Sequence, residues 1–345
     1  MKHSFRNDYG EGAHPALLKA LMETNTVQQD GYGEDRYCRE AADMIRARLG
    51  REDAVIHFLS GGTQTNLIAI SSALRPHEAA IAAETGHILV HETGAIEATG
   101  HKVIAMPAEG GKLSAAAIQA AVDAHTDEHM VKPALVYLSQ STEIGSIYHK
   151  GELEAIRAVC DRNRLLLYVD GARLGSALTA ASGDVTLADM ARLTDAFYIG
   201  GTKNGALLGE ALVLNNPSLQ QDLRFHMKQK GALLAKGRII GLQFRELFRD
   251  NLFFDLAQHA NRMAARMRDG IATSGFAFLT DSPTNQIFPI LPDTLIQRLQ
   301  EHYGFYVWAR ETDTSSSIRL VTSWATPDAV VEAFLEDFAR AAADR

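Results

Sequence analysis

A lysine behind an apolar run carries the clearest chemical signal in this chain. The stretch "YIGGTKNG" places Lys203 after two glycines, with Gly205 two residues further on. Most lysines lie on solvated loops, and that interpretation is the plain one here. The apolar run and the glycines favour another: an amine in a confined loop beside a flat partner, as Schiff-base chemistry requires.

An acid and an arginine follow a second apolar run. In "LLLYVDGARLG", Asp170 ends the run and Arg173 comes three residues later. The two side chains could simply form an ion pair. Alternatively, the carboxylate faces a protonated ring nitrogen and the guanidinium receives an anionic group of a substrate.

A third loop is rich in glycine. The stretch "FLSGGTQTNL" puts Gly61, Gly62 and Thr63 between an apolar run and a helical pattern. Glycines let the backbone approach a phosphate, and a helix N-terminus offers free N–H groups to it. The motif matches neither the dinucleotide nor the ATP-binding loops, and a tight turn explains the glycines equally well.

Together the three loops have the order and the roles of a pyridoxal-phosphate site. Gly62 and Thr63 would hold the phosphate, Asp170 the ring nitrogen and Lys203 the aldehyde carbon. This hypothesis requires a fold that brings the three loops to one place.

The elements that must position these loops alternate along the first 215 residues. We expect strands over 54–60, 102–107, 134–140, 164–170 and 195–201, with helices over 37–50, 63–74, 113–125 and 152–163. Apolar strands separated by helices predict a mainly parallel sheet buried on both faces. Ligands of such sheets bind outside the carboxyl ends of the strands, where the three loops fall.

The pattern changes after about residue 215. Helical stretches dominate 218–273, short strands are expected over 276–279, 286–291 and 317–324, and helices over 292–303 and from 326 onward. We therefore predict an α/β protein with two domains. Residues 1–249, including the N-terminal segment, form the large one, and residues 250–345 form a smaller α+β domain.

Composition excludes several classes of function. The chain has 345 residues, is 46% hydrophobic and carries a net charge of −8, without the basic clusters that nucleic-acid binding needs. Cys38 and Cys160 match no metal or redox spacing, and no other cluster predicts a metal. Neither a secretory signal nor a bilayer-spanning run is apparent, so we expect a cytoplasmic protein.

Several motifs resemble one family. They are "RNDYG", "DGYGEDRY", "FLSGGTQTNL", "GHILVHETGAIE", "SQSTEIGSIY", "VDGARL" and "GGTKNG". These stretches are similar to the β-eliminating lyase/threonine aldolase family, and within it to the low-specificity L-threonine aldolases. The resemblance begins near Phe5, is strongest in the first two thirds and implies fold type I, that of aspartate aminotransferase.

The resemblance assigns roles to the loop residues. It implies pyridoxal 5′-phosphate bound covalently to Lys203, with the phosphate at Gly62 and Thr63 and the ring nitrogen at Asp170. Arg173 then matches a residue that binds the substrate carboxylate, and "SIRLVTS" supplies a second arginine, Arg319. Two guanidinium groups on one carboxylate would fix the orientation of the α-carbon.

Further residues follow from the same resemblance. His87 matches a histidine that stacks on the cofactor ring, although an ordinary half-buried histidine is the plain alternative. Glu92 is a weaker candidate beside it. Tyr32 is similar to a tyrosine that reaches a neighbouring subunit's site. Lys236 and Arg238 would contact phosphate across the same interface or belong to a solvated helix face.

Two positions depart from the family pattern. Asn7 stands where many members have a serine near the substrate carboxylate, and its amide can still donate a hydrogen bond. Glu143 stands where well-studied members have a histidine near the substrate β-hydroxyl. We therefore expect Glu143, or a water held by His87, to accept the hydroxyl proton.

The predicted reaction is carbon–carbon cleavage of L-threonine, L-allo-threonine or other L-3-hydroxy-α-amino acids to glycine and an aldehyde. The aromatic stretch "FYVWAR" with Trp324 could favour a β-aryl substrate such as phenylserine, or could pack a core. The alternatives are β-elimination, racemisation or transamination by the same cofactor, and a non-catalytic protein that binds a phosphate ligand. A homodimer or homotetramer with active sites at the dimer interface is implied by the resemblance.

Overall fold

A seven-stranded sheet forms the centre of the larger unit in the computed structural model, which describes residues 1–343. The strands are ordered β2-β8-β7-β6-β5-β3-β4. Their bounds are Val55–Leu59 (β2), Glu210–Leu214 (β8), Ala196–Gly200 (β7), Leu166–Asp170 (β6), Lys132–Ser139 (β5), Glu78–Ala83 (β3) and Val103–Met106 (β4). The strands from β7 to β4 run parallel, and β8 is antiparallel to both of its neighbours. The predicted α/β architecture with a mainly parallel sheet is confirmed.

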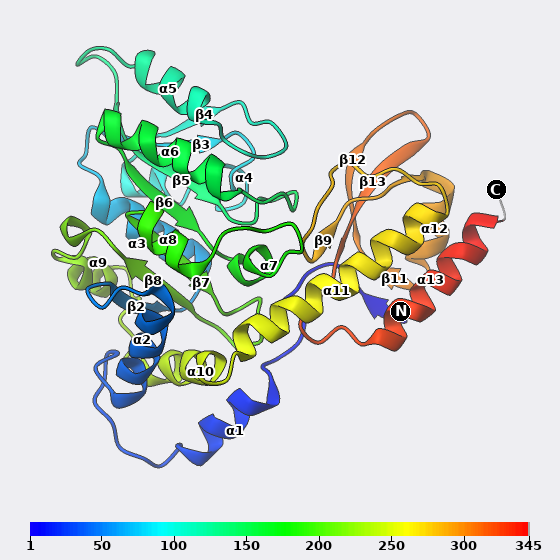
Figure 1. The fold of residues 1–345 in the computed structure, drawn as a ribbon, viewed down its shortest axis with the longest axis horizontal. Coiled ribbons are helices and arrows are strands. Elements are labelled where there is room, and N and C mark those ends of the chain that lie inside the picture. Colours follow the sequence, from blue (N-terminus) through cyan, green and yellow to red (C-terminus); the bar gives the residue numbers. More distant parts are fainter. Residues whose placement is uncertain (344–345) are drawn as a thin grey trace.

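Helices cover both faces of this sheet (Figure 1). One apolar core joins the sheet to α2 (Arg36–Leu49), α5 (Ala115–Asp123), α6 (Lys150–Asn163), α8 (Leu187–Leu193) and α10 (Arg238–Arg249). The other core joins it to α3 (Gly62–Ala73) and α9 (Leu223–Gln229). Short helices α4 (His87–Val90) and α7 (Leu174–Leu178) follow strands, and α1 (Pro15–Glu23) packs on α10.

Two strands of the central sheet, β3 and β8, were not predicted from the local sequence pattern. The sequence of β3, "EAAIAA", is mostly alanine, a strong helix former, yet all six residues are buried between the two helical layers. Strand β8 lies between β2 and β7. Conversely, the strand expected over 276–279 is reduced to a single bridge between Phe278 and Pro289. Tertiary burial decides these segments rather than residue preference.

A smaller unit is built on the long helix α11 (Leu252–Thr273), which runs from the larger unit along the smaller one (Figure 1). Strands β9 (Gln286–Ile287), β10 (Ile290–Pro292), β12 (Tyr306–Arg310) and β13 (Ser315–Val321) form its sheet. Helices α12 (Asp293–Gln300) and α13 (Asp328–Ala343) complete it. Phe253 and Leu256 of α11 belong to a core of the larger unit, whereas Met263 and Ile271 belong to that of the smaller one.

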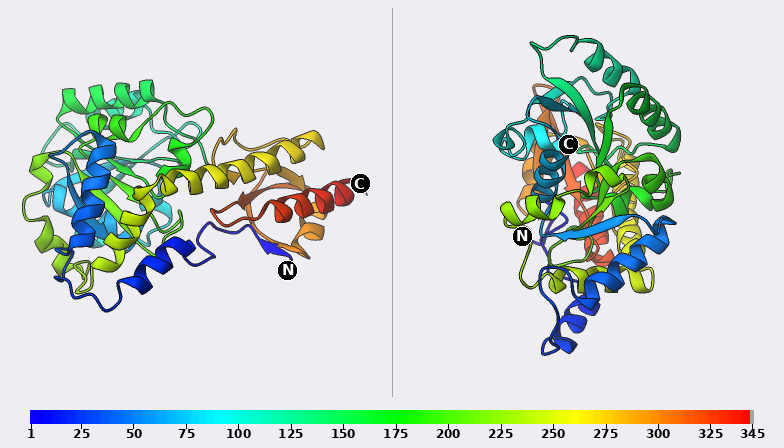
Figure 2. Two further views of the ribbon diagram at one scale, coloured as in Figure 1. Left: turned by 60° about the horizontal axis from the view of Figure 1, so that its bottom comes forward. Right: turned by 90° about the vertical axis from the view of Figure 1, so that its left-hand side faces the viewer.

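The chain's beginning lies with the smaller unit, whereas the sequence places it in the larger domain. Strand β1 (His3–Ser4) pairs with β11 (Tyr303–Gly304), and Phe5 is fully buried in the same core as Phe334. Figure 2 shows this strand beside the C-terminal helix. Such pairing between distant segments leaves no local pattern. Within residues 1–343, no helix is both long and apolar enough to cross a membrane.

Candidate active site

A cavity of about 340 Å³ lies at the carboxyl ends of the central strands. The loops after β2, β5, β6 and β7 meet there, because parallel neighbouring strands end at one edge of the sheet. The cavity brings together seven of the residues predicted from the sequence: Gly62, Thr63, His87, Glu143, Asp170, Arg173 and Lys203.

Lys203 lies in the loop directly after β7. Enclosure of its amine lowers the pKa of Lys203 to about 8, with a further contribution from Arg173, while Asp8 and Asp170 oppose the shift. The glycines before it serve the backbone. A side chain at Gly200 would meet the carbonyl of Ala172, and one at Gly201 would meet the carbonyl of Gly209. They let the loop pack tightly rather than widen the cavity.

Asp170 accepts hydrogen bonds from three neutral side chains and from the backbone N–H of Ala172, the last at 3.0 Å. The hydroxyl groups of Tyr198 and Tyr137 donate to its carboxylate at 2.5 and 2.7 Å, and Nδ2 of Asn66 donates at 2.9 Å. Burial alone would raise the pKa of Asp170, but the neighbouring His87 and these hydrogen bonds lower it below its ordinary value. The carboxylate therefore stays ionised and suits a cationic ring nitrogen.

His87 is the first residue of α4, and its side chain contacts the buried carboxylate of Glu92. Its Nδ1 lies 2.7 Å from Oε1 of Glu92, which also accepts a hydrogen bond from Nδ2 of Asn66 at 2.7 Å. One ring nitrogen of His87 and one carboxylate oxygen each of Glu92 and Asp170 lie within 4.8 Å of one another. The sequence did not predict this cluster. The amide of Asn66 joins the two acids into one network.

The glycine loop presents a free helix end to the cavity. Helix α3 begins at Gly62, and its N-cap residue, Gly61, caps it with no side chain. The first N–H groups of the helix therefore have no side-chain acceptor and can receive a phosphate. Ser60 and Thr63 add hydroxyl groups to the same wall.

A second cavity of about 270 Å³ opens beside the first and contains the two arginines. Nε and Nη2 of Arg173 donate to Asp8 at 2.7 and 3.0 Å, and Nε and Nη2 of Arg319 donate to Gln286 at 3.1 and 2.6 Å. Burial and the charge of Arg173 lower the pKa of Arg319 to about 10. Arg173 and Arg319 line the same cavity, and two guanidinium groups there suit an anion.

Comparison with known proteins agrees with this geometry. The family model described as beta-eliminating lyase matches residues 5–293. The chain belongs to the β-eliminating lyase family. It is 31% identical, over 96% of both chains, to the low specificity L-threonine aldolase of Pseudomonas sp. (strain NCIMB 10558). It is 28% identical to the low specificity L-threonine aldolase of Escherichia coli (strain K12), over 89% of each of the two chains.

Solved structures give the same family and fold. The threonine aldolase of Leishmania major matches with a TM-score of 0.97 and 49% identity, covering 99% of both chains. An aspartate aminotransferase of Thermus thermophilus matches with a TM-score of 0.72 at 15% identity, covering 99% of this chain and 91% of that one, which shows the shared fold alone. The family, the fold type and the lyase class predicted from the sequence are confirmed.

The residues present fit the cofactor expected for this β-eliminating lyase. An amine with a lowered pKa, an ionised buried acid and an uncapped helix N-terminus line one cavity. These are the donors and the charge that an aldehyde, a protonated pyridine nitrogen and a phosphate require. Family, fold and cavity agree on pyridoxal phosphate as the cofactor.

Glu143, the departure from the family pattern, reaches both cavities. Its Oε1 accepts hydrogen bonds from Oγ of Ser139 at 2.7 Å and from the backbone N–H of His87 at 2.9 Å. Burial raises the pKa of Glu143. Both of these hydrogen bonds end on Oε1.

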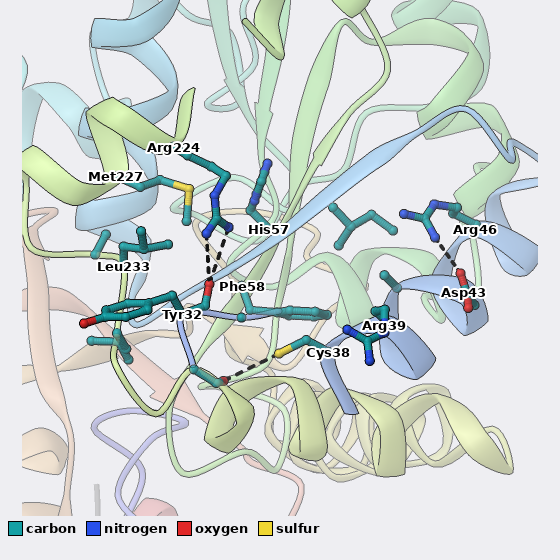
Figure 3. Close-up of a pocket in the computed structure, with 16 residues that line it drawn as sticks. Tyr32, Cys38, Arg39, Asp43, Arg46, His57, Phe58, Arg224, Met227 and Leu233 are labelled. Atoms are coloured by element: carbon teal, nitrogen blue, oxygen red, sulfur yellow. Dashed lines mark hydrogen bonds and ion pairs between the residues drawn. The ribbon is translucent and has the colours of Figure 1, made fainter. Parts of the chain in front are cut away.

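The remaining predicted residues lie elsewhere in this single chain. Oδ1 of Asn7 accepts from the backbone of Tyr9 at 3.1 Å and closes a turn. Tyr32 lines a separate cavity of about 290 Å³, where Arg224 reaches its carbonyl oxygen at 3.4 Å (Figure 3). Arg238 donates to the carbonyls of Thr24 and Val27, and Lys236 lines neither cavity of the candidate site.

Several site residues were not predicted from the sequence: Asp8, Asn66, His91, Glu210 and Gln286. Asp8 and Gln286 hold the two arginines, and Asn66 joins the acids. Glu210 accepts from the N–H of Gly201 and the hydroxyl of Thr202, beside Lys203, and burial raises its pKa to about 7. The one available signal was position: Asp8 and His91 stand inside motifs that carry the resemblance, next to residues already chosen.

The aromatic stretch divides between cavity and core. Trp308 lines the arginine cavity, with Arg319 over its ring at 5.6 Å. Trp324 instead packs on the larger core and meets His14 edge to face at 5.7 Å. Of these two tryptophans, only Trp308 stands where a substrate side chain could touch it.

Proposed function

We propose that this chain is a pyridoxal-phosphate-dependent aldolase that splits L-threonine, L-allo-threonine or other L-3-hydroxy-α-amino acids into glycine and an aldehyde. One observation carries the proposal: Lys203 and Arg173 line both cavities, so the cofactor's anchor and the carboxylate site meet at one wall. The relatives named low specificity L-threonine aldolase support the same reaction.

The cofactor would bind in the first cavity, the one lined by Gly62, Asp170 and Lys203. Lys203 would hold the aldehyde carbon, Gly62 and Thr63 the phosphate, and Asp170 the ring nitrogen. When bound, pyridoxal phosphate supplies an electron-withdrawing ring conjugated to the substrate nitrogen. His87, held by Glu92, would lie against the ring and keep water from that side.

Binding of the substrate falls to the second cavity. Arg173 and Arg319 receive the α-carboxylate, and the amine faces Lys203. Fixing both groups leaves one orientation for the Cα–Cβ bond, which selects the bond that breaks. Carboxylate binding also offsets the mutual repulsion that lowers the pKa of Arg319.

The β-substituent then points away from the arginines' partners toward the outer wall. Glu143 lines both cavities, and burial raises the pKa of its carboxyl group, so this side chain would face the β-hydroxyl as a hydrogen-bonding partner. Trp308 offers an apolar face for a methyl or an aryl group. This supports L-phenylserine as a substrate beside L-threonine.

The assembly and location belong to the proposal as well. We place active sites at the interface of a homodimer or of a homotetramer made from dimers, where Tyr32 would reach the site of the second copy. Tyr32 and Phe225 are exposed at 44 and 75%, and Arg224 beside Phe225 contacts Tyr32, which supports a covered surface in that region. Two free buried cysteines and the composition support the cytoplasm.

Product analysis tests the proposed function. The purified protein, loaded with pyridoxal phosphate, is incubated separately with L-threonine, L-allo-threonine and L-phenylserine. We expect glycine and the matching aldehyde in equal amounts from at least one of them. Ammonia with a keto acid in place of glycine would assign β-elimination instead, and no turnover of any of them would favour a binding protein.

A further inference from the structure

A second histidine faces the substrate cavity. His91 follows α4 directly, and its backbone N–H bonds to the carbonyl of His87 at 2.9 Å. The two imidazole rings lie with centroids 5.4 Å apart. His91 lines the arginine cavity but not the cofactor cavity, and it is exposed at the mouth.

The neighbours of His91 are already engaged. Nδ1 of His87 is taken by Glu92, and Oε1 of Glu143 is taken by Ser139 and a backbone N–H. Within the described residues 1–343, no hydrogen bond reaches the ring nitrogens of His91. Both ring nitrogens of His91 are therefore available to a substrate in the arginine cavity.

Charge around His91 keeps the imidazole neutral. Partial burial lowers its pKa, and the charges of His87, Arg319 and Lys203 lower it further, against a smaller opposite effect of Glu92. Glu143, Arg173 and Tyr9 complete the titratable and charged groups of this cavity. A neutral imidazole is a proton acceptor at neutral pH.

Resting on the proposed function, we propose that His91 is the catalytic residue that takes the proton of the substrate β-hydroxyl. With the carboxylate and the amine held beside Arg173 and Lys203, which also line the cofactor cavity, the β-carbon would project toward the mouth of the arginine cavity, where the exposed His91 stands. The hydroxyl proton passes to the imidazole, the O–H electron pair forms the aldehyde C=O, and the Cα–Cβ pair stays on Cα. Cα later takes up a proton to give glycine, and the imidazolium returns its proton to water.

This assignment leaves Glu143 a different task. Its carboxylate spans both cavities and is held by the backbone of His87, so it fixes the first turn of α4 and thereby both histidines. It is a positioning residue for His91. His91, directly after α4, would thus take the role of the histidine that well-studied members of the family have where this chain has Glu143.

Two reactions of the loaded enzyme separate this role from the rest of the site. Cleavage of L-threonine needs a base for the β-hydroxyl, whereas exchange of the glycine α-proton with D2O needs the cofactor, Lys203 and the arginines but no such base. We expect His91→Asn to lower kcat for cleavage by roughly 10²- to 10⁴-fold, with KM and glycine exchange changed less than about threefold. The pH profile of wild-type cleavage should fall on the acid side below the ordinary histidine range, and His91→Asn should lose that limb.

A second experiment measures the titration of His91 directly, without any catalytic turnover. In the cofactor-free protein labelled with ¹⁵N-histidine, several imidazole signals should titrate below the ordinary range, those of His57 and His91 among them, and one of these signals should disappear in His91→Asn, with an unchanged melting temperature. Glu143→Gln should keep that signal and lose less cleavage than His91→Asn. Cleavage by His91→Asn at the wild-type rate, or an equal fall of glycine exchange, overturns the role of His91 alone. A wild-type protein that exchanges the glycine α-proton but releases no glycine from L-threonine, L-allo-threonine or L-phenylserine overturns the proposed function, and this assignment with it.

Discussion

Nδ1 of His87 lies 2.7 Å from Oε1 of Glu92, and the side chain of Glu92 is completely buried. A carboxylate at this distance fixes Nδ1 as the donor and leaves Nε2 facing the cavity. Since Asn66 donates to Glu92 and to Asp170 with the same nitrogen, the ring of His87 and the acid for the cofactor nitrogen belong to one rigid network.

Replacing Glu92 should therefore act through His87. We expect Glu92→Ala to lower kcat by about 10- to 100-fold, as outer partners of functional histidines do, while Glu92→Gln keeps an acceptor and loses less. Steady-state kinetics with L-threonine measure both, and ¹⁵N shifts of His87 report its tautomer. An Ala variant with wild-type kcat and an unchanged His87 signal would show that the contact is only structural.

The ion pair of Asp8 with Arg173 is the second structural prediction. Asp8 is 1% exposed, so removing its charge leaves a buried guanidinium unpaired, which should cost about 3 kcal/mol of unfolding free energy. Urea unfolding of Asp8→Asn at pH 7 measures this. The matched control is Asp53→Asn, because Asp53 pairs with Arg51 in the open and should change stability little.

This ion pair also predicts a pH dependence of stability. Burial would raise the pKa of Asp8, but Arg173 and Lys203 lower it to about 2, below the value of about 3.9 in an unfolded chain. Because the pKa of Asp8 is lower in the folded state, its ionised carboxylate stabilises the protein above about pH 4. This stabilisation is lost as the pH falls toward 2. Urea titrations across that range should show a smaller decline for Asp8→Asn than for wild type; parallel curves would exclude this contribution.

The two glycines of the phosphate loop should respond differently to alanine. A methyl group at Gly62 would lie 2.9 Å from the hydroxyl oxygen of Tyr198, which holds Asp170, whereas one at Gly61 would meet nothing within 4 Å. Gly62→Ala should destabilise the cofactor-free protein by about 1–3 kcal/mol and weaken pyridoxal-phosphate binding. Thermal melting without cofactor compares the variants, and equal stability of both would contradict the contact.

Loading of the cofactor should depend on pH through Lys203. Only the neutral amine attacks an aldehyde, so the rate should rise with pH around the lowered pKa of about 8. The nearby carboxylate of Glu210 raises the pKa of Lys203, so Glu210→Gln should move this midpoint to lower pH. Stopped-flow absorbance of the apo protein mixed with pyridoxal phosphate follows the reaction; a midpoint that stays in place would remove Glu210 from the account.

The strand-end loops of the site could be predicted from the sequence because their physics is local. Lys203, Asp170 and Gly62 each follow an apolar strand, and parallel strands bring such ends together. Resemblance then supplied Arg319, which lies 146 positions beyond Arg173 and shares no local pattern with it.

The supporting residues could not be predicted in this way. Asp8 finds Arg173 165 positions away, and Gln286 meets Arg319 only because β9 pairs with β13. No local pattern marks His91 as a site residue, and only the folded chain brings it into one cavity with Arg319 and Trp308. The alanine-rich β3 is a strand because both of its faces are buried, which only the assembled sheet provides.

The most direct test of the central claim is a proton NMR time course of L-threonine with the loaded protein, beside Lys203→Ala. The wild type should release glycine and acetaldehyde one to one, and the variant neither, because Lys203 anchors the cofactor at the wall shared by both cavities. Appearance of 2-oxobutanoate without glycine, or equal turnover by Lys203→Ala, would contradict the account.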